Sequence, residues 1–146
     1  MYNIKRATPH DYPRIMEIWE SAVLATHDFL KKQDFELFKQ LIPSEFLPHL
    51  QVFVLEQNRQ IDAFFSVSDD NLEMLFVHDK VRGKGLGKQA VTYVVYILII
   101  LKVDVNEQNP QAIGFYEKVG YKKVGRSQLD GMGKPYPLVH FEFLKV

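Results

Sequence analysis

The spacing of apolar residues over the first fifty positions predicts one strand and two helices. Polar and apolar side chains alternate over residues 2–7, which is typical of a strand. Residues 8–11, Thr-Pro-His-Asp, indicate a helix start, since the threonine can cap the helix and the aspartate can bond back to it. The apolar residues that follow recur at helical intervals, at Tyr12, Met16, Trp19 and Val23. A second helix is expected within residues 34–47, interrupted or ended by its prolines.

From residue 51 the pattern becomes that of strands. Three runs rich in β-branched and aromatic residues, 51–56, 61–67 and 72–78, are separated by the turn-forming groups Asn-Arg and Asp-Asp-Asn. Such runs, joined by turns this short, are typical of hairpins. The middle of the chain is therefore expected to form an antiparallel meander of three strands.

After residue 78 helical and strand patterns alternate. A glycine-rich segment leads into an apolar helix, and a strand is expected near residues 99–105. Residues 110–119 predict a short helix, with Asn109 as its cap and Gly120 as its stop. Two more strands are expected, at residues 121–126 and 137–144. Together these elements predict an α/β fold with a mixed sheet.

Composition narrows the class of protein. The chain has 146 residues, no cysteine, and 18 basic against 18 acidic side chains. The lack of cysteine excludes a disulfide framework, a thiolate nucleophile and a zinc ribbon. A net charge of +0 argues against a nucleic-acid partner, because such proteins usually present a strongly basic face. The sequence contains no repeat, low-complexity tract or linker, which indicates one domain over residues 1–146.

No segment indicates export or membrane insertion. Residues 1–6 carry charge with no apolar run behind them, unlike a secretory signal. The longest apolar run, residues 90–101, is shorter than the ~20 residues that span a bilayer, and it is interpreted as buried core. We therefore expect a cytoplasmic protein with no membrane partner. A short helix in this run would expose apolar surface, which leaves a homodimer open beside a monomer.

Residues 81–88, Val-Arg-Gly-Lys-Gly-Leu-Gly-Lys, carry the most informative pattern. Three glycines in five positions, between a strand and a helix, allow the backbone to turn tightly and to approach a ligand closely. The N–H groups of the loop and of the helix start suit phosphate oxygens, and three basic side chains add positive charge. The spacing of Gly83 and Gly87 does not match a Walker loop, and Lys88 occupies the third glycine position of a dinucleotide fingerprint.

What remains, Arg-x-x-Gly-x-Gly over residues 82–87, resembles the pyrophosphate loop of the GCN5-related N-acetyltransferases, the GNAT family. Residues 109–121 are similar to that family's signature N-x-x-A-x-x-F-Y-x-x-x-G-[FY], in the family's order and spacing. The resemblance is specific over about residues 72–121, while the N-terminal half matches only in the order of its elements. It implies the GNAT fold, a mostly antiparallel sheet splayed at two parallel strands, with flanking helices.

The resemblance implies acetyl-coenzyme A as the cosubstrate and no metal. It places the pantetheine arm along the backbone of residues 75–77 and the pyrophosphate on the N–H groups of the glycine loop. A backbone N–H near Phe76 would polarise the thioester carbonyl. The residues expected to bind the coenzyme are Leu75, Phe76, Val77, Arg82, Gly83, Lys84, Gly85, Leu86, Gly87, Lys88, Asn109 and Tyr116.

By the same resemblance the acceptor amine attacks the thioester directly in a ternary complex, and Tyr116 is the general acid. A phenol with a pKa of ~10 stays protonated at neutral pH and can donate to a thiolate whose thiol has a pKa of ~8.5. Spacing alone favours another interpretation, because Tyr116 belongs to an apolar helical face with Ala112, Phe115 and Val119. The position in the family signature favours the catalytic role.

The sequence does not decide which group removes the proton from the acceptor amine. Asp104, on the strand after the apolar helix, and Glu73, on the preceding strand, are both catalytic candidates, and each is equally typical of a solvated strand end. A water chain can serve instead. His27 and Asp28, at the end of the first helix, and Tyr136 near the C-terminus are expected to contact the acceptor.

These inferences predict an N-acetyltransferase that moves an acetyl group from acetyl-coenzyme A to a primary amine. The amine belongs to a protein lysine, a protein N-terminus or a small molecule, and the sequence does not choose among them. The acceptor surface is expected from residues 25–49 and 130–136. The alternative is a non-catalytic acyl-coenzyme A sensor, which would need the glycine loop but neither Tyr116 nor a base. The presence of both favours the enzyme.

Overall fold

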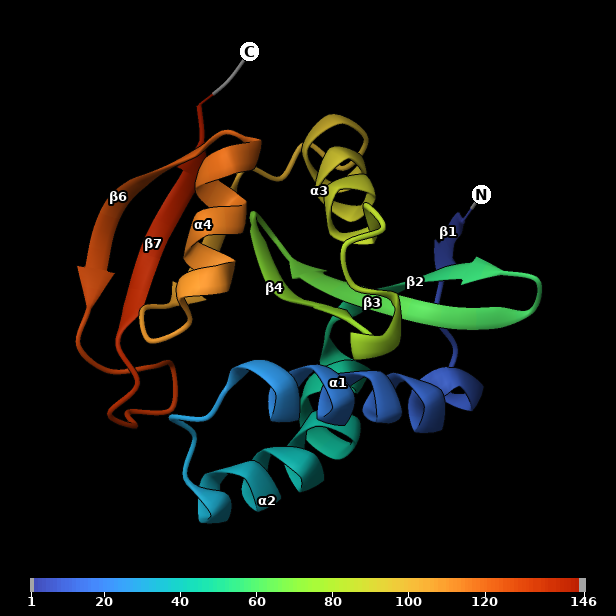
Figure 1. Ribbon diagram of the computed structural model, residues 1–146, viewed down its shortest axis with the longest axis horizontal. Coiled ribbons are helices and arrows are strands. Elements are labelled where there is room, and N and C mark those ends of the chain that lie inside the picture. Colours follow the sequence, from blue (N-terminus) through green and yellow to red (C-terminus); the bar gives the residue numbers. More distant parts are fainter. Residues whose placement is uncertain (1, 145–146) are drawn as a thin grey trace.

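The computed structural model describes residues 2–144, and a seven-stranded sheet forms its centre. The strand order is β1-β2-β3-β4-β5-β7-β6, in which β4 and β5 are parallel and every other neighbouring pair is antiparallel. Figure 1 shows β1–β4 on one side of the molecule and β6 and β7 on the other. The predicted mixed sheet is confirmed. The strands are β1 (Asn3–Arg6), β2 (Gln51–Gln57), β3 (Gln60–Ser68), β4 (Asn71–Val77), β5 (Lys102–Asn106), β6 (Tyr121–Ser127) and β7 (Leu138–Phe143).

Helices cover both faces of this sheet. The α-helices are α1 (Tyr12–Thr26), α2 (Lys32–Leu41), α3 (Leu86–Tyr96) and α4 (Pro110–Val119). The first two pack with the sheet around one hydrophobic cluster, and α3 and α4 pack around a second cluster on the opposite face. Figure 1 shows α1 and α2 together below the sheet, well apart from α3. The predicted cap and stop of α4 are confirmed, because Asn109 caps it and Gly120, with a φ of 121°, ends it.

The buried face of α1 differs from the predicted stripe. The N–H of Thr8 donates to Asp11 Oδ2 at 3.0 Å, so the start signal is confirmed. The stripe was right for Trp19 and Val23, but the side chains that lie deepest are those of Ile15 and Ile18, and Ala22 is also buried. Tyr12 and Met16 lie half-buried at the margin of this cluster.

The three-strand meander has the predicted order and turns. Asn58 and Arg59, between β2 and β3, have φ values of 53° and 64°. Two consecutive positive φ values are the mark of a type I′ turn, whose twist matches that of the flanking strands. The second predicted helix is also present as α2. It is continued by a π-helical turn (Ile42–Phe46) and a 3₁₀ turn (Leu47–His49), so its prolines change the helical geometry without a sharp stop.

The apolar run at residues 90–101 is core over its first half and again at Ile100, which is 7% exposed. Ala90, Val91, Val94 and Val95 are buried, whereas Tyr96, Ile97 and Ile99 are 55–69% exposed. The interpretation of the whole run as core was therefore wrong. The helix ends at Tyr96, because Ile99 takes a φ of 56° and the chain turns into β5, which begins three residues later than expected.

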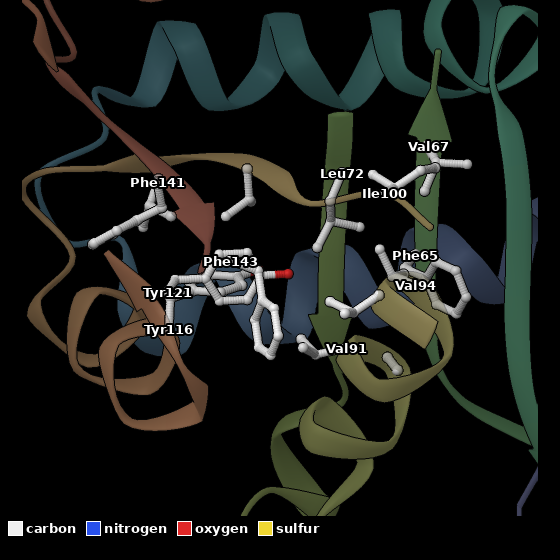
Figure 2. Packing of buried hydrophobic residues seen from close by; sticks show 14 of the residues in the cluster. Phe65, Val67, Leu72, Val91, Val94, Ile100, Tyr116, Tyr121, Phe141 and Phe143 are labelled. Carbon is white, nitrogen blue, oxygen red and sulfur yellow. The ribbon is translucent and has the colours of Figure 1, made fainter. Parts of the chain in front are cut away.

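The larger cluster holds α3 and α4 against the sheet. Figure 2 shows Tyr116, Tyr121 and Phe143 gathered on one side of it and Phe65 and Val94 on the other, with Leu72 between them. Leu72 is 1% exposed and lies on β4, so this cluster joins the two halves of the sheet at the parallel strand pair. Within residues 2–144 no helix is long and apolar enough to cross a membrane. The same residues hold no group of three side chains suited to a metal ion.

Candidate active site

The two parallel strands separate after only two paired positions. Asn71 and Leu72 of β4 face Lys102 and Val103 of β5, and no further residues of the two strands are in register. On its other edge, the pairing of β4 with β3 shifts so that Glu73 has no partner. Such a β-bulge bends a strand. The bulge therefore turns β4 away from β5 and opens a gap between them.

The splay leaves one edge of β4 unpaired. Leu75, Phe76 and Val77 pair with β3 but have no strand on the β5 side, and all three are half-buried. A free strand edge offers N–H and C=O groups to an extended ligand. The gap is a cavity of about 140 Å³. Its lining is His27, Leu72, Glu73, Met74, Leu75, Phe76, Val103, Asp104, Val105, Asn106, Asn109, Ala112 and Tyr116.

The glycine loop connects β4 to α3 and exposes backbone donors at the helix start. Gly83 and Gly85 have φ values of 79° and 86°, a conformation that favours glycine. The N–H of Gln89 donates to the carbonyl of Gly85 at 3.0 Å, which is the first hydrogen bond of the helical ladder. The preceding N–H groups of the first turn have no partner within the helix. This arrangement fits a phosphate group.

The third glycine has a packing role beside the predicted contact with the ligand. Gly87 lies in the first turn of α3, where an added Cβ would stand 3.2 Å from the ring of Phe115 on α4. Its missing side chain therefore allows the two helices to approach, and it is not needed for the turn. Leu86 is 3% exposed and belongs to the core, so only its backbone can face a ligand.

Basic side chains surround the glycine loop. Arg82 donates through Nη1 to Asp79 at 3.1 Å and through Nη2 to Gln111, which links the loop to the first turn of α4. Lys84 and Lys88 are exposed. A cavity of about 660 Å³ between α3 and α4 is lined by Arg82, the loop glycines and Lys88. The sequence-predicted phosphate site is thus one continuous surface.

Tyr116 faces the gap from α4. It is 7% exposed, and its ring lies edge-on to Phe115 and Tyr121 at centroid distances of 5.0 and 5.3 Å. It lines both the gap and an adjoining cavity of about 210 Å³ beneath Arg82 and Gly87. Burial, and then the neighbouring Tyr121, raise the pKa of Tyr116. The phenol therefore stays protonated at neutral pH.

Asn109 lies beside Tyr116 at the start of α4. Its side-chain oxygen accepts the N–H of Ala112 at 3.2 Å, and the residue is 8% exposed. It lines the gap and the adjoining cavity. The cap uses the oxygen of the amide, so the amide nitrogen is left to donate toward a ligand in the gap.

A fourth cavity, of about 200 Å³, opens on the α1 side of the sheet. It shares His27, Phe76 and Asn106 with the gap, so the two cavities meet at these residues. We call it the acceptor cavity. Its walls are mostly aromatic and aliphatic, formed by Trp19, Val23, His27, Phe29, Leu30, Phe38, Phe76, Asn106, Asp130, Tyr136 and Leu138.

His27 stands where the cavities meet. Thr26 Oγ1 donates its hydrogen to the carbonyl of Ala22 and lies 2.7 Å from His27 Nδ1. Nδ1 must therefore carry the ring hydrogen, which leaves Nε2 as an acceptor. Burial lowers the pKa of His27 to about 4, against a weaker opposing effect of Asp28. The ring is neutral at physiological pH.

The outer wall of the acceptor cavity is held by a buried polar cluster. The hydroxyl of Tyr136 donates to the carboxylate of Asp34 and accepts the N–H of Lys31 at 3.2 Å. Lys134 Nζ lies 2.8 Å from the other oxygen of Asp34. We call Asp34, Lys134 and Tyr136 the clasp, because they tie the β6–β7 loop to α2. Figure 1 shows this loop beside the connection between α1 and α2.

Of the remaining predicted residues, three line the gap or the acceptor cavity and one lines neither. Asp104 and Glu73 both line the gap, and the carboxylate of Glu73 accepts from Asn71 at 2.7 Å and from Ser68 at 3.0 Å. Asp28 is exposed and lines neither the gap nor the acceptor cavity. Tyr136 contributes its ring to the acceptor cavity, while its hydroxyl is engaged in the clasp.

Sequence reasoning missed Asn106, Gln111 and His140. Phe29, Asp34 and Lys134 fall within residues 25–49 and 130–136, which were expected to form the acceptor surface, but none of the three was singled out. Asp34 alone had a usable signal in the sequence, because it is an acidic residue in a helix that is expected to pack on the sheet. The structure shows that its side chain is buried. Nothing in the local pattern of the others distinguishes them from ordinary surface or strand positions.

A family model and curated proteins of known name both match this chain. The model of the family described as "Acetyltransferase (GNAT) domain" matches residues 48–123. The chain is 39% identical over 142 residues to "Peptidyl-lysine N-acetyltransferase YjaB" of Salmonella typhimurium, covering 96% of this chain and 97% of that protein.

Solved structures with similar folds also superimpose on this chain. The solution structure of apo-form YjaB from Escherichia coli superimposes with a TM-score of 0.92 at 37% identity, covering 100% of this chain and 99% of that one. A PaiA N-acetyltransferase from Thermoplasma acidophilum, solved in complex with coenzyme A, superimposes with a TM-score of 0.75. Its identity is 16%, and the coverage is 98% of this chain and 99% of that one, so this likeness shows the fold alone.

Proposed function

The chain belongs to the GNAT acetyltransferase family and is an N-acetyltransferase, and we propose that its acceptor is the side-chain amine of lysine in another protein. The observation that carries this proposal is the acceptor cavity, which has a volume of about 200 Å³, is mostly apolar and shares His27, Phe76 and Asn106 with the gap. A lysine side chain has a four-carbon apolar stem and one terminal amine. The stem suits aromatic walls, and the amine would arrive in the gap. The name of the 39% identical relative supports the same acceptor.

We propose that acetyl-coenzyme A enters from the opposite face. The free edge of β4 at residues 75–77 would pair with the pantetheine arm, and the N–H groups at the start of α3 would hold the pyrophosphate. Arg82 and Lys88 would add charge to the phosphate contacts. The amide nitrogen of Asn109 would donate to the coenzyme in the gap. A backbone N–H on the free edge of β4 would stabilise the oxyanion that forms when the thioester is attacked.

Tyr116 is proposed as the acid that protonates the leaving thiolate. Tyr116 lines both the gap and the adjoining cavity of about 210 Å³. Its raised pKa keeps its proton available for the thiolate. Direct attack by the amine needs no enzyme nucleophile, which agrees with a chain that has no cysteine. General acid catalysis of this kind typically contributes 10²–10⁴-fold to a rate.

Two measurements test the proposal in sequence. Calorimetric titration with acetyl-coenzyme A, with ATP and NAD as comparators, should show selective binding of acetyl-coenzyme A. Acetyl transfer is then measured on a peptide with a blocked N-terminus and one lysine, on a lysine-free peptide with a free N-terminus, and on spermidine. Acetylation of the blocked lysine peptide is the expected result.

The other outcomes discriminate between the alternatives. Transfer to the free N-terminus or to spermidine alone would contradict the lysine acceptor while retaining the enzyme. Selective binding of acetyl-coenzyme A with no transfer to any amine would favour the acyl-coenzyme A sensor. Equal binding of all three nucleotides would contradict the assignment of the glycine loop.

A further inference from the structure

Asp104 does not stand alone beside the gap. Its Oδ1 atom lies 2.5 Å from Nδ1 of His140, which faces it across the β5–β7 pair. The Nε2 atom of the same ring lies 2.7 Å from Oγ of Ser127 at the end of β6. A carboxylate, an imidazole and a hydroxyl therefore form one hydrogen-bonded row across three strands.

This row lies on the acceptor face of the sheet. Val103 and Val105, which flank Asp104, are buried in the cluster with α3 and α4, so the side chain of Asp104 points the other way. Asn106 and Leu138 are also register partners, and both line the acceptor cavity. They stand two residues along from Asp104 and His140, a step of roughly 7 Å on the same face.

The two protons of the reaction must be handled on opposite faces of the gap. Tyr116 comes from α4, on the coenzyme face, whereas Asp104 lines the same gap from the acceptor face. An acceptor ammonium that arrives through the acceptor cavity would reach the row before it reaches the thioester. The row is also partly open to solvent, since the side chains of His140 and Asp104 are 34% and 40% exposed.

We propose, on the basis of the proposed function, that Asp104 and His140 act together as the proton acceptor for the lysine ammonium, with Ser127 orienting the ring. The carboxylate of Asp104 takes the proton of the ammonium, and His140 is a positioning residue whose Nδ1–H donates to Oδ1 and holds the carboxylate in place.

The reaction then balances. The ammonium loses one proton to Asp104, and the neutral nitrogen forms a bond to the thioester carbon. The carbon–sulfur bond breaks, and the thiolate takes the proton of Tyr116. The second proton lost by the nitrogen, as the amide forms, restores Tyr116 by way of solvent. Asp104 releases its proton to water through its exposed edge. The products are the acetylated lysine, the free thiol of coenzyme A and one proton.

Other charged groups surround the row and must be considered in any pH profile. Glu73 on β4 lines the gap, but its carboxylate is engaged with Ser68 and Asn71. Lys102 lies next along β5 and pairs with Asp70 at 3.3 Å. The other titratable groups nearby are Glu142 on β7 with its register partner Lys122 on β6, Asp130 in the β6–β7 loop, and His27 at the end of α1.

The test is the pH dependence of kcat/KM for a lysine peptide between pH 6.5 and 9.5. Asp104→Asn and His140→Gln should each lower kcat/KM by about 100-fold at pH 7. That loss should shrink about tenfold for each pH unit gained, because the amine, with a pKa of ~10.4, loses its proton to solvent increasingly often. Ser127→Ala should show a smaller loss of the same kind. Glu142→Gln, on the same face of β7 but outside the row, should match the wild type.

A structural role would give a different result. Variants that lose the same factor at every pH, with the wild type fully active, would overturn the pair while leaving the acetyltransferase function intact. The pair would also be overturned if kcat/KM rose with pH, relative to the wild type, in His27→Gln and not in the Asp104 and His140 variants. Calorimetry with acetyl-coenzyme A checks that each variant keeps its coenzyme site. A wild type that acetylates no lysine peptide would remove the proposed function, and the pair with it.

Discussion

The two sides of the gap are built in different ways. The proposed coenzyme side comes from three short stretches, the free edge of β4, the glycine loop before α3 and the first turns of α4, and much of it is backbone. The acceptor side is assembled from the end of α1, from α2, from β5 and from the β6–β7 loop, and it consists of side chains. Tyr136 and Asp34, which close its outer wall, are 102 residues apart in the chain. One side is local in sequence, and the other exists only after folding.

This difference has a functional consequence. A site made of N–H groups and a free strand edge needs a particular backbone conformation, and it tolerates many side chains. A cavity with aromatic walls depends on each ring and on the contacts that hold it. Substitutions on the coenzyme side should therefore alter coenzyme affinity or turnover. Substitutions on the acceptor side should alter acceptor use or stability and leave coenzyme binding unchanged.

The largest expected effect is that of Tyr116→Phe. Loss of the hydroxyl removes the proposed proton donor while the ring keeps its place against Phe115 and Tyr121. Turnover should fall about 100- to 1,000-fold, within the range of a lost general acid. The affinity for acetyl-coenzyme A, measured by calorimetry, should stay within about twofold.

Tyr121→Phe is the matched control for this change. The Tyr121 hydroxyl is buried and has no hydrogen-bond partner within residues 2–144, and its ring lies 5.3 Å from that of Tyr116. Removing an unpaired buried hydroxyl is nearly neutral or stabilising. Turnover of this variant should match the wild type. An equal loss in both variants would show that packing, and not the hydroxyl of Tyr116, limits the reaction.

The contrast between the two sides also explains what the sequence could predict. The local structure on the proposed coenzyme side was predictable because its signals are contiguous: a glycine pattern sets a left-handed turn, and the asparagine and glycine that bound α4 act on their neighbours. Even there the pattern gave no sign that Gly87 packs against Phe115, 28 positions away. A contact over that distance leaves no local signal.

The acceptor side was predicted only in outline. Residues 25–49 and 130–136 were expected to form it, and both ranges contribute walls to the acceptor cavity. The partner of Asp104 was not found, because His140 meets it only through the β5–β7 register. The start of β5 was placed three residues too early for a related reason. The apolar run continues past Tyr96, so hydrophobicity gave no sign that the backbone would turn at Ile99.

The next effect concerns His27 and the acid stability of the acceptor side. Burial lowers the pKa of His27 to about 4 in the folded protein, against 6.5 for a free histidine. As pH falls from 6.5 to 4, the unfolded chain takes up the proton first, so stability is full at pH 7 and is lost over this window. The loss should amount to up to about 3 kcal/mol. Urea unfolding at pH 7 and pH 4 measures it.

The comparison for this prediction is between two histidine variants. His27→Gln should reduce the difference in unfolding free energy between pH 7 and pH 4. His10→Gln, at an exposed position before α1, should leave that difference as it is in the wild type. A wild-type difference that His27→Gln does not reduce would mean that the imidazole is solvated when the protein is folded.

A smaller effect is expected on the coenzyme side from Gly87→Ala. The new Cβ would stand 3.2 Å from the ring of Phe115, so α3 and α4 must move apart by a fraction of an ångström. Overpacking of this kind costs about 1–3 kcal/mol. We expect acetyl-coenzyme A to bind about tenfold more weakly. Gly114→Ala, on α4 with open space around it, should instead keep the affinity and raise stability by about 0.5–1 kcal/mol.

The smallest effect should come from Tyr136→Phe in the clasp. The variant keeps the ring that lines the acceptor cavity and the ion pair between Lys134 and Asp34, but it loses the hydroxyl that donates to Asp34. One hydrogen bond of this kind contributes about 1 kcal/mol, or about 2–4 °C in Tm for a domain of this size. A loosened β6–β7 loop should raise KM for the lysine peptide a few-fold and leave acetyl-coenzyme A affinity unchanged. Tyr12→Phe, at the start of α1 and outside both cavities, is the control. Weaker acetyl-coenzyme A binding in Tyr136→Phe would show that the two sides of the gap are coupled, and that the division between them does not hold.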